Sequence, residues 1–431
     1  MKKYRDLRKR IEKDKARKAK ARAKRHAEHD GLETISSWTN WIQAAQASQI
    51  SASFKRSVQA FNDQSILQIR AMRKTILAGG VPNVATNREC VIRERGKRRK
   101  ITPVVIDDRV MQHVLSDNGI TPLLRPIVIR QSCANQLHKG TYLARLLADR
   151  YLEEAKRKWG TFYIMTFDFQ NFFGSIRHDQ CACVLRRLFD DERLVKLAMM
   201  IITSYQAAQL RKRLKEDPSF TSTEYSQAIA DLCAWKGVGV CLGSQISQDM
   251  AIMVPDPIDK LIKTRMPYYI RFADDGLIIW HSKEDLIALK HDIEEAARRI
   301  GLTLHPHKTI IRRSDQGFIF LKTRYRIVER KTIKRIDRGS IIRMRRKLRK
   351  FGHLVQAGRM SFDDVYASLA SWKSHTTHTR CTRTLKSIDM LYDKTFGGAA
   401  CDTTKSDETE RSSAADHPDP CGGSSPGGGS R

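Results

Sequence analysis

Two adjacent carboxylates, Asp274 and Asp275, lie between two apolar segments of the chain. Residues 267–270 read Pro-Tyr-Tyr-Ile, and residues 276–280 read Gly-Leu-Ile-Ile-Trp. Apolar stretches rich in aromatic and β-branched residues that meet at Asp-Asp-Gly are typical of two buried strands joined by a tight hairpin. Paired carboxylates near a hydrophobic sheet are costly unless cations neutralise them. The pattern therefore predicts a divalent metal site at the tip of a hairpin.

A third carboxylate, Asp168, follows the apolar segment 161–167, which we expect to be a strand. Carboxylates at the ends of neighbouring strands could share two Mg²⁺ ions roughly 3.5–4 Å apart, with Mn²⁺ as a substitute. Such a pair would activate an attacking 3′-hydroxyl and stabilise a leaving pyrophosphate. The pairs 190–191 and 363–364 are also Asp-Asp but lie in polar surroundings, so we expect turns or solvated pairs there.

The overall charge favours a phosphate-rich partner. The 431 residues include 79 Lys and Arg against 47 Asp and Glu, a net charge of +32. This bias favours nucleic acid over a membrane, because no apolar run approaches the ~20 residues that cross a bilayer. The charged N-terminus is unlike a secretion signal, and the nine scattered cysteines suit a reducing cytoplasm. Cys181 and Cys183 have the wrong spacing for a zinc knuckle.

Periodicity places the elements around these carboxylates. Residues 1–30 hold 14 Lys or Arg against five acids, and either a solvated tail or an arm ordered by RNA explains them. The remaining predictions are a helical pair over 32–77, a basic hairpin over 91–101, a helix from about 107, helices within 178–235, a Gly-rich loop at 237–243, helices over 246–263 and 284–300, and strands near 302–304 and 318–325.

The C-terminal part of the chain is strongly basic and then changes composition. Residues 322–350 hold 14 Lys or Arg against two acids, and a basic helix beyond 340 is either an exposed face or a helix that follows a nucleic-acid backbone. Residues 371–375 fit a further helix. From Gly397 the chain is rich in Ser, Thr, Asp, Pro and Gly, so we expect disorder there.

Taken in order, these segments resemble reverse transcriptases. The resemblance covers roughly residues 80–395 and rests on six ordered blocks, which are Arg99-Lys-Ile with Asp108-Arg109-Val110-Met-Gln112, Asp168-Phe-Gln-Asn-Phe172-Phe173-Gly-Ser-Ile176-Arg-His178, Leu242-Gly243-Ser-Gln-Ile-Ser247-Gln248, Phe272-Ala-Asp-Asp275, Leu304-His-Pro-His-Lys308-Thr309 and Gly317-Phe-Ile-Phe-Leu321. The departures from the family pattern are Phe272, where a Tyr often stands, and Lys322, where a Gly normally follows the Phe-Leu motif.

One block separates subgroups of the family. Group II intron enzymes usually carry Gln-Gly-x-x-x-Ser-Pro, whereas this chain has Leu242-Gly243 and ends the block in Ser247-Gln248. This form looks like the reverse transcriptase of diversity-generating retroelements. The resemblance implies error-prone copying of a template-repeat RNA into cDNA, with mutations at template adenines. It also implies a basic accessory variability protein as a partner and a bacterial or phage-encoded origin.

The resemblance assigns roles residue by residue. Asp168, Asp274 and Asp275 would ligate the metals, with the Phe169 backbone carbonyl as a further ligand. Phe173 would be the steric gate that selects dNTPs, although an ordinary core Phe is the simpler interpretation and Phe172 is its core neighbour. The other candidates for substrate binding are the basic hairpin tip Lys97, Arg98, Arg99 and Lys100, the floor beneath the templating pair Leu242, Gly243 and Gln248, and Lys308.

Among the four basic residues, Arg99 matches the family motif best. One or two of the four are expected to be exposed to solvent without contacting the triphosphate. Lys308 either protonates pyrophosphate or anchors its loop. The His305-Pro-His307 segment lacks a third ligand in the sequence, so we expect solvent-exposed histidines there instead of a metal site.

The fold class implied is α+β, a right-hand polymerase with fingers, an antiparallel-sheet palm and a short helical thumb. The expected divisions are 1–31 as a basic arm, 32–160 as a helical extension and fingers, 161–322 as the palm with interleaved finger helices, 323–395 as the basic thumb and 396–431 as a disordered tail.

The alternatives are a retron, phage-defence or group II intron-type reverse transcriptase, a DNA-templated polymerase, and a non-catalytic RNA-binding scaffold. The residues after the thumb leave no room for a ribonuclease H or endonuclease domain, which disfavours a maturase. The presence of all three carboxylates, Asp168, Asp274 and Asp275, disfavours a non-catalytic RNA-binding scaffold, because such a protein would not need to keep clustered carboxylates that are costly to bury.

Overall fold

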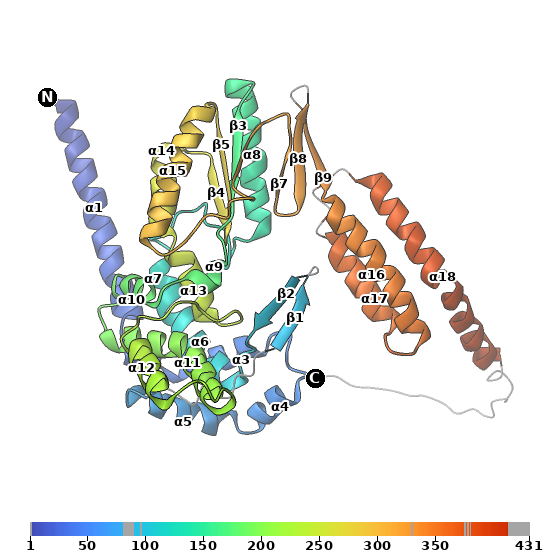
Figure 1. Ribbon diagram of the computed structural model, residues 1–431, viewed down its shortest axis with the longest axis horizontal. Coiled ribbons are helices and arrows are strands. Elements are labelled where there is room, and N and C mark those ends of the chain that lie inside the picture. Colours follow the sequence, from blue (N-terminus) through green and yellow to red (C-terminus); the bar gives the residue numbers. More distant parts are fainter. Residues whose placement is uncertain are drawn as a thin grey trace, which may run out of the picture. The chain divides into compact units, whose positions relative to one another are not determined.

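The computed structural model describes residues 2–80, 90–94, 97–328, 331–374, 376, 379 and 381–412. The chain divides into two compact units (Figure 1). Unit 1 comprises the residues up to 321 together with 326–332, and unit 2 comprises 322–325 together with the residues from 333. In the described part of the chain, every helix is too short or too polar to cross a bilayer.

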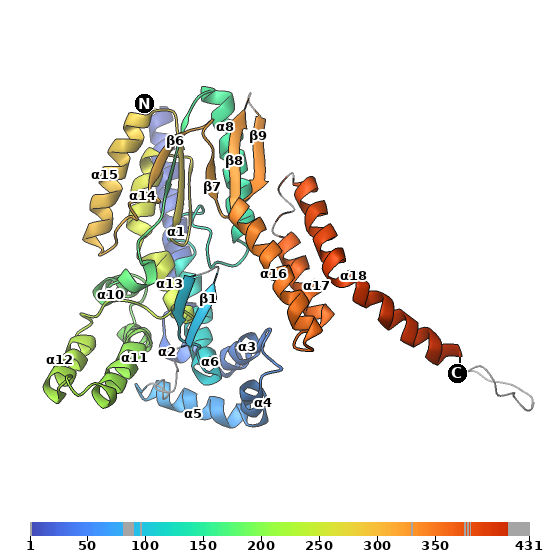
Figure 2. The same cartoon turned by 45° about the vertical axis from the view of Figure 1, so that its right-hand side comes forward.

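A four-stranded antiparallel sheet forms the centre of unit 1. Its order is β4 (Tyr269–Phe272), β5 (Asp275–Trp280), β3 (Tyr163–Phe167) and β6 (Ile310–Arg313). Helix α8 (Thr141–Trp159) covers one face, while α14 (Asp256–Arg265) and α15 (Lys283–Arg299) cover the other (Figures 1 and 2). Because both faces are covered, the central strands are apolar almost throughout, and the predicted hairpin and strand are confirmed.

A second group of elements in unit 1 surrounds the predicted basic hairpin. The hairpin is β1 (Cys90–Glu94) paired with β2 (Lys97–Ile101), as expected. The helices that follow it are α6 (Ile106–Leu115), the π-helix η1 (Ser116–Ile120), α7 (Thr121–Leu124), α9 (Phe172–Ser175), α10 (His178–Arg186), α11 (Glu192–Glu216) and α12 (Ser222–Cys233). The expected helix from about 107 and the helices within 178–235 are therefore present.

The N-terminal region contains more helices than the sequence predicted. Residues 2–29 form one helix, α1 (Lys2–His29). The helical pair predicted over 32–77 is wrong, because four helices are present: α2 (Leu32–Ile35), α3 (Trp38–Gln49), α4 (Arg56–Asp63) and α5 (Ser65–Leu77). Ser37 caps α3 and Ser51 adopts a left-handed φ of 59°, and both interrupt the chain where the apolar periodicity continues.

Two further predictions near the sheet are wrong. The helix expected over 246–263 is two helices, α13 (Gln245–Met253) and α14, because Pro255 lies between them and proline has no N–H to continue the helical hydrogen bonds. The strand expected near 302–304 is only a single bridge between Leu304 and Phe169. The fourth strand of the sheet is β6 instead.

The strand expected over 318–325 is divided. It forms β7 (Phe318–Phe320) and β8 (Thr323–Val328), and β9 (Lys331–Ile336) completes a three-stranded sheet in the order β7-β8-β9. Leu321 and Lys322 separate the strands with left-handed φ values of 47° and 66°. This backbone region favours glycine, which is the residue that the family pattern has in place of Lys322.

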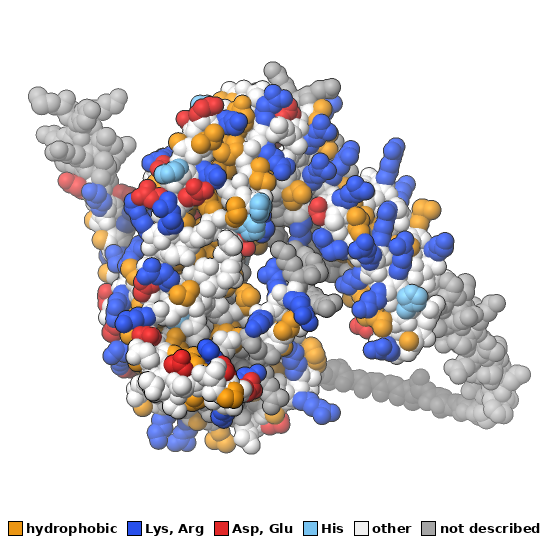
Figure 3. Space-filling model, in the orientation of Figure 1, with side chains coloured by type: hydrophobic (Ala, Val, Ile, Leu, Met, Phe, Trp, Pro, Cys, Tyr) orange, Lys and Arg blue, Asp and Glu red, His pale blue; other side chains and the backbone are white. Residues whose placement is uncertain are grey.

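Unit 2 has its own small core between helices. These are α16 (Arg338–Gln356), α17 (Phe362–Ser374) and α18 (Thr382–Ser412), with Met344, Leu348, Val365, Leu369 and Ile388 buried among them. Figure 3 shows Lys and Arg side chains gathered over α16. Helix α18 extends to Ser412 and so includes part of the segment from residue 397 for which the sequence predicts disorder. Residues 413–431 and His375 lie outside the described residues.

A buried ion pair joins β4 to α14. The guanidinium of Arg271 donates from Nε and from one terminal nitrogen to the two oxygens of Asp259, both at 2.7 Å. The Tyr269 hydroxyl donates to the same carboxylate at 2.7 Å. Arg271 is 1% exposed and Asp259 0% exposed. The remaining guanidinium N–H groups bond to the carbonyls of Ala251, Ile252 and Ala273, so this cation is fully satisfied.

Replacing Arg271 by Met should lower the free energy of unfolding by about 3–5 kcal/mol, because the Asp259 carboxylate then stays buried without its cation. The control is Arg265→Met, which breaks the exposed ion pair between Arg265 and Asp292 and should cost less than about 1 kcal/mol. Urea denaturation of the two variants measures both values. Equal losses would contradict a structural role for the buried pair.

Candidate functional site: a carboxylate cluster at the sheet end

The hairpin between β4 and β5 presents two of the three predicted carboxylates. Phe272 pairs with Asp275, so the turn consists of Ala273 and Asp274. Ala273 has a φ of 55°, as tight hairpin turns require, and its carbonyl accepts a hydrogen bond from Arg271 at 3.0 Å. Asp274 therefore lies in the turn itself, and Asp275 is the first residue of β5.

Gly276 allows β3 to approach this hairpin closely. It pairs with Phe167, and a Cβ atom at Gly276 would lie 2.2 Å from the Phe167 ring. No larger residue fits without moving one of the strands. The close approach brings the end of β3, where Asp168 follows Phe167, beside Asp275.

A loop after α15 holds Asp168 in place. The backbone N–H of His305 donates to the Asp168 carbonyl at 2.7 Å, and the N–H of Gln170 donates to the Thr303 carbonyl at 2.8 Å. The Lys308 ammonium donates to the Asp168 carboxylate at 2.6 Å. Of the two roles expected for Lys308, the structure shows the anchoring contact. His305 is only partly exposed, so the expectation that both histidines face solvent is wrong for it, because its backbone is bonded to Asp168.

The three carboxylates affect one another electrostatically. Burial, then the negative charges of Asp274 and Asp168, raises the pKa of Asp275 to about 7. Burial and then the charge of Asp168 raise the pKa of Asp274. The positive charge of Lys308 lowers both pKa values, but by less than burial and the neighbouring carboxylates raise them. The cluster thus gathers more negative charge than its neighbouring cations neutralise.

This donor set fits divalent metal ions. Hard cations such as Mg²⁺ prefer carboxylate oxygens, and two such cations would remove the repulsion that raises these pKa values. Asp168, Asp274 and Asp275 are the residues that would hold them. The ring of Phe169 is 1% exposed and packs on Phe172, whereas a metal contact by its backbone carbonyl stays a prediction.

Within the basic hairpin, Arg99 interacts electrostatically with the cluster. Its positive charge lowers the pKa of Asp274, so the guanidinium lies within electrostatic range of that carboxylate. Arg98 and Lys100 are exposed, and strand alternation places them on the opposite face from Arg99. Lys97 pairs with Glu94 through the backbone, and its side chain lies outside the described residues.

Phe172 and Phe173 occupy different environments. Phe172 is 5% exposed and stacks on Phe169, with ring centroids 5.4 Å apart. Phe173 is partly exposed, touches the Phe172 ring edge-on, and accepts a hydrogen bond from Val240 N–H at its carbonyl. Of the two residues, Phe173 is therefore the more exposed.

The Gly-rich loop is attached to the end of the basic hairpin. The Thr102 N–H donates to the Leu242 carbonyl at 3.1 Å. Gly243 has a φ of 117°, and a Cβ atom there would lie 2.8 Å from the Thr102 carbonyl oxygen, so a glycine is needed. Gln248 accepts a hydrogen bond from the Asn135 amide. The loop that contains the predicted floor residues is thus fixed by contacts with Thr102 and Asn135.

Sequence reasoning missed the polar network beneath this loop. Gln112 on α6 accepts hydrogen bonds from the Ser244 hydroxyl at 2.9 Å and from the Gln245 N–H at 2.8 Å. Ser116 donates to Asp249 at 2.7 Å, and burial raises the pKa of Asp249 to about 7. Gln112 belongs to a quoted sequence block, but nothing in the block indicates its partners. Arg271 was likewise visible only as a charge among apolar residues.

The raised pKa of Asp275 gives a pH-dependent stability. Its protonated form stabilises the fold below the unfolded-state value of 3.8, and this contribution is lost as the pH rises through about 7. Without divalent ions, Asp275→Asn should therefore raise the free energy of unfolding by roughly 1–3 kcal/mol at pH 8, and by less at pH 5. Urea denaturation in a chelator at both pH values measures this.

The control for that experiment is Asp363→Asn, which removes one exposed carboxylate and should change stability by less than about 0.5 kcal/mol. A gain from Asp275→Asn that is the same at both pH values would contradict the electrostatic interpretation.

Comparison with known proteins identifies the family. Among solved structures, the chain is similar to telomerase from Candida albicans in complex with a fragment of telomeric RNA, with 12% identity, a TM-score of 0.39, and coverage of 72% of this chain and 59% of that chain. It is also similar to apo telomerase from Candida tropicalis truncated from its C-terminal domain, with 12% identity, a TM-score of 0.37, and coverage of 59% and 56%. The chain thus spans less than two thirds of either telomerase.

No curated protein matches the chain in sequence. The family model described as reverse transcriptase (RNA-dependent DNA polymerase) matches residues 87–321, more than half of the chain, and this range includes the carboxylate cluster, the basic hairpin and the Gly-rich loop. The chain belongs to the reverse transcriptase family.

Proposed function

We propose that this chain is an RNA-directed DNA polymerase, and specifically the reverse transcriptase of a diversity-generating retroelement. It copies a template-repeat RNA into cDNA and introduces errors at template adenines. The observation that carries the proposal is the loop Leu242-Gly243 through Ser247-Gln248, which has an apolar residue and a Gln where group II intron enzymes have Gln and Pro. Template RNA, cDNA and dNTPs are its substrates and products, and a basic accessory variability protein is its expected partner in a bacterial cytoplasm.

The reaction proposed is nucleotidyl transfer at the carboxylate cluster. When bound by Asp168, Asp274 and Asp275, two Mg²⁺ ions would activate the primer 3′-hydroxyl and stabilise the leaving pyrophosphate. The chain itself contributes positioning and charge. The bond from Lys308 fixes the Asp168 carboxylate, and the left-handed turn at Ala273 fixes Asp274.

Two further side chains select and orient the nucleotide in this proposal. The charge of Arg99 acts on Asp274, and in this proposal its guanidinium binds the triphosphate oxygens of an incoming dNTP. The exposed part of the Phe173 ring would contact the sugar and exclude a 2′-hydroxyl. Phe172 supports this ring from the core, since the two rings meet edge-on at 5.5 Å.

We attribute the reduced copying fidelity to the loop of residues 242–248, which is proposed to lie beneath the templating base pair. Discrimination between base pairs rests on a few kcal/mol of differential contacts. Leu242 offers an apolar side chain where a Gln could form hydrogen bonds, and the Gln248 side chain accepts a hydrogen bond from Asn135. Fewer polar contacts to the nascent pair would lower the selectivity of the site at template adenines.

Primer extension on an RNA template with Mg²⁺ and dNTPs tests the activity. Asp274→Asn should lower the extension rate by at least about 10³-fold, because it removes one charged metal ligand. The matched control is Asp364→Asn, an exposed carboxylate outside the cluster, which should extend at the wild-type rate. Synthesis by Asp274→Asn at the wild-type rate would overturn the assignment of the site.

Sequencing of the cDNA tests the subtype, with and without the candidate accessory protein. Substitutions concentrated at template adenines support a diversity-generating retroelement. Faithful cDNA would overturn that subtype and favour a retron or phage-defence enzyme. A wild-type protein that binds RNA but makes no cDNA with or without the partner would favour a non-catalytic scaffold.

Phe173→Ala should raise the incorporation of rNTPs relative to dNTPs by roughly 10- to 100-fold, because it removes the ring that excludes the 2′-hydroxyl. Phe172→Leu is the control, since this ring is buried, and it should lower stability without changing the choice of sugar. Single-nucleotide incorporation of matched rNTP and dNTP pairs measures the ratio. An unchanged ratio in Phe173→Ala would assign this ring to packing alone.

A further inference from the structure

The middle of helix α1 is strongly basic and lacks large apolar residues. Residues 12–24 contain seven Lys or Arg, two acids and four Ala, with no larger apolar residue. All of these side chains are exposed except Asp14, which is partly buried. In Figure 1 the N-terminal part of α1 stands apart from the other elements of unit 1. Such a helix has nothing to bury against a protein core.

The basic side chains form stripes along this helix. Residues 13, 17, 20 and 24 follow one another at spacings of four, three and four, and residues 15, 18, 22 and 25 follow at three, four and three. Residues so spaced lie on one face of a helix, so both stripes are continuously basic. Within the described residues, Lys13, Lys15 and Lys20 have no acidic partner, whereas Arg17 and Lys18 share Asp14.

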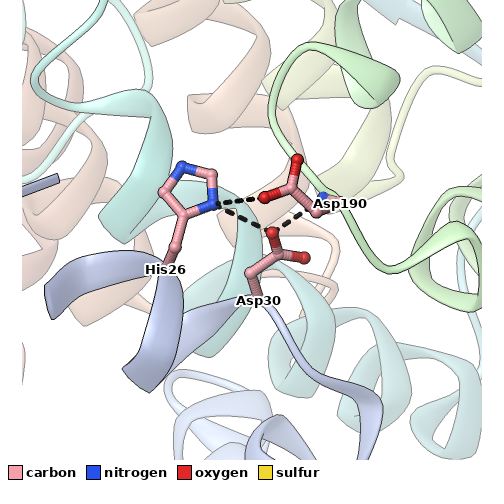
Figure 4. A group of neighbouring side chains, drawn as sticks. All are labelled: His26, Asp30 and Asp190. Atoms are coloured by element: carbon pink, nitrogen blue, oxygen red, sulfur yellow. Dashed lines mark hydrogen bonds and ion pairs between the residues drawn. The ribbon is translucent and has the colours of Figure 1, made fainter. Parts of the chain in front are cut away.

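The C-terminal end of α1, in contrast, is fixed by specific contacts. Figure 4 shows His26 and Asp30 directed at Asp190, which lies just before α11. The two Asp30 oxygens accept the backbone N–H groups of Asp190 at 2.7 Å and Asp191 at 3.1 Å. His26 Nδ1 lies 2.9 Å from Asp30 and 3.5 Å from the Asp190 carboxylate.

This group contains a possible metal-ligand set of one imidazole and two carboxylates. Both oxygens of Asp30 already accept backbone donors, however, and the Asp190 side chain is 90% exposed. We therefore interpret His26, Asp30 and Asp190 as a structural contact between α1 and the start of α11, called the clasp below.

Further contacts extend the clasp in both directions. The Asp191 carboxylate accepts a hydrogen bond at 3.0 Å from the backbone N–H of Leu32, the first residue of α2. Arg193 donates to Glu33 and to Asp191. The His29 ring bonds to the Asn118 carbonyl in η1 at 2.8 Å. A helix that is fixed at one end and exposed over residues 12–24 has a defined direction relative to the elements that hold its end.

We propose that α1 is an RNA-docking helix, which binds the phosphate backbone of a folded part of the RNA that carries the template. This inference rests on the proposed function, because it assumes an RNA template, and it adds a binding surface outside the carboxylate cluster. The partner is a polyanion because two stripes of residues 12–25 are continuously basic, and the faces between them carry Ala and only two acids, Glu12 and Asp14. A docking helix for a protein would need apolar anchor residues, which this segment lacks.

The first test measures binding of a 20-base-pair RNA hairpin by fluorescence anisotropy at several salt concentrations. The variant Lys13→Gln, Lys15→Gln, Lys20→Gln removes the three lysines without an acidic partner. It should weaken binding about 10- to 100-fold and reduce the slope of log K against log salt by about two. The control Lys196→Gln, Lys215→Gln, Lys283→Gln removes the same charge from exposed positions on α11 and α15. Equal losses in the two variants would overturn the proposal.

The second test separates positioning from net charge. Asp30→Ala removes the acceptor of the clasp and makes the protein more positive. Attraction by net charge alone predicts tighter binding of the hairpin, whereas loss of a fixed α1 predicts binding that is three- to tenfold weaker. Tighter or unchanged binding would overturn the role of the clasp, and with it a directed docking helix.

Primer extension on a short primer–template, without the hairpin, is the common control. All variants should extend it at the wild-type rate, which also shows that they are folded. If the wild type itself makes no cDNA on this substrate with or without the accessory protein, the proposed function fails. If the wild type extends it but hairpin binding does not depend on α1, only the docking inference fails.

Discussion

The Arg271 guanidinium lies inside unit 1, where it is bonded to Asp259 on α14, to carbonyls at the end of α13, and to the Ala273 carbonyl in the hairpin turn. Its backbone also bonds to Gln131 and Cys133, in the segment before α8. One residue thus connects a strand, two helices, a loop and the turn that carries Asp274. A buried cation can stay only where every donor has an acceptor, so these contacts specify a single arrangement of the hairpin.

The β4–β5 hairpin needs these stabilising contacts because the carboxylates that it brings together repel one another. Burial and mutual repulsion raise the pKa values of Asp274 and Asp275, which means that the folded protein disfavours their charged forms. The favourable ion pair of Arg271 and the unfavourable cluster lie on the same short strand and its turn. The contacts of Arg271 thus hold the hairpin in a conformation that keeps the repelling carboxylates close together. A site that binds metal ions through several carboxylates requires this arrangement.

The sequence predicted the parts of the fold that depend on local pattern. The Asp-Asp hairpin, the strand before Asp168 and the basic hairpin were recognised because apolar runs and charges mark them. It did not predict β6, whose Ile310 and Ile311 are too few to mark a strand, or the interruptions at Ser51 and Pro255. The contacts of Arg271 with Asp259 and of Gln112 with Ser244 join residues distant in the chain. No local pattern records which distant residue satisfies a buried polar group.

The hydrogen bond from Thr102 to Leu242 has a consequence for how the enzyme moves. Thr102 directly follows the strand that carries Arg99, and Leu242 belongs to the loop proposed to lie beneath the templating pair. In the proposed function, binding of a triphosphate by Arg99 and contact of the new base pair with the loop would therefore be mechanically linked. A mismatched pair that displaces the loop would also displace the hairpin through the contacts of Thr102 with Cys241 and Leu242, so base selectivity would depend on how stiffly these contacts transmit the displacement.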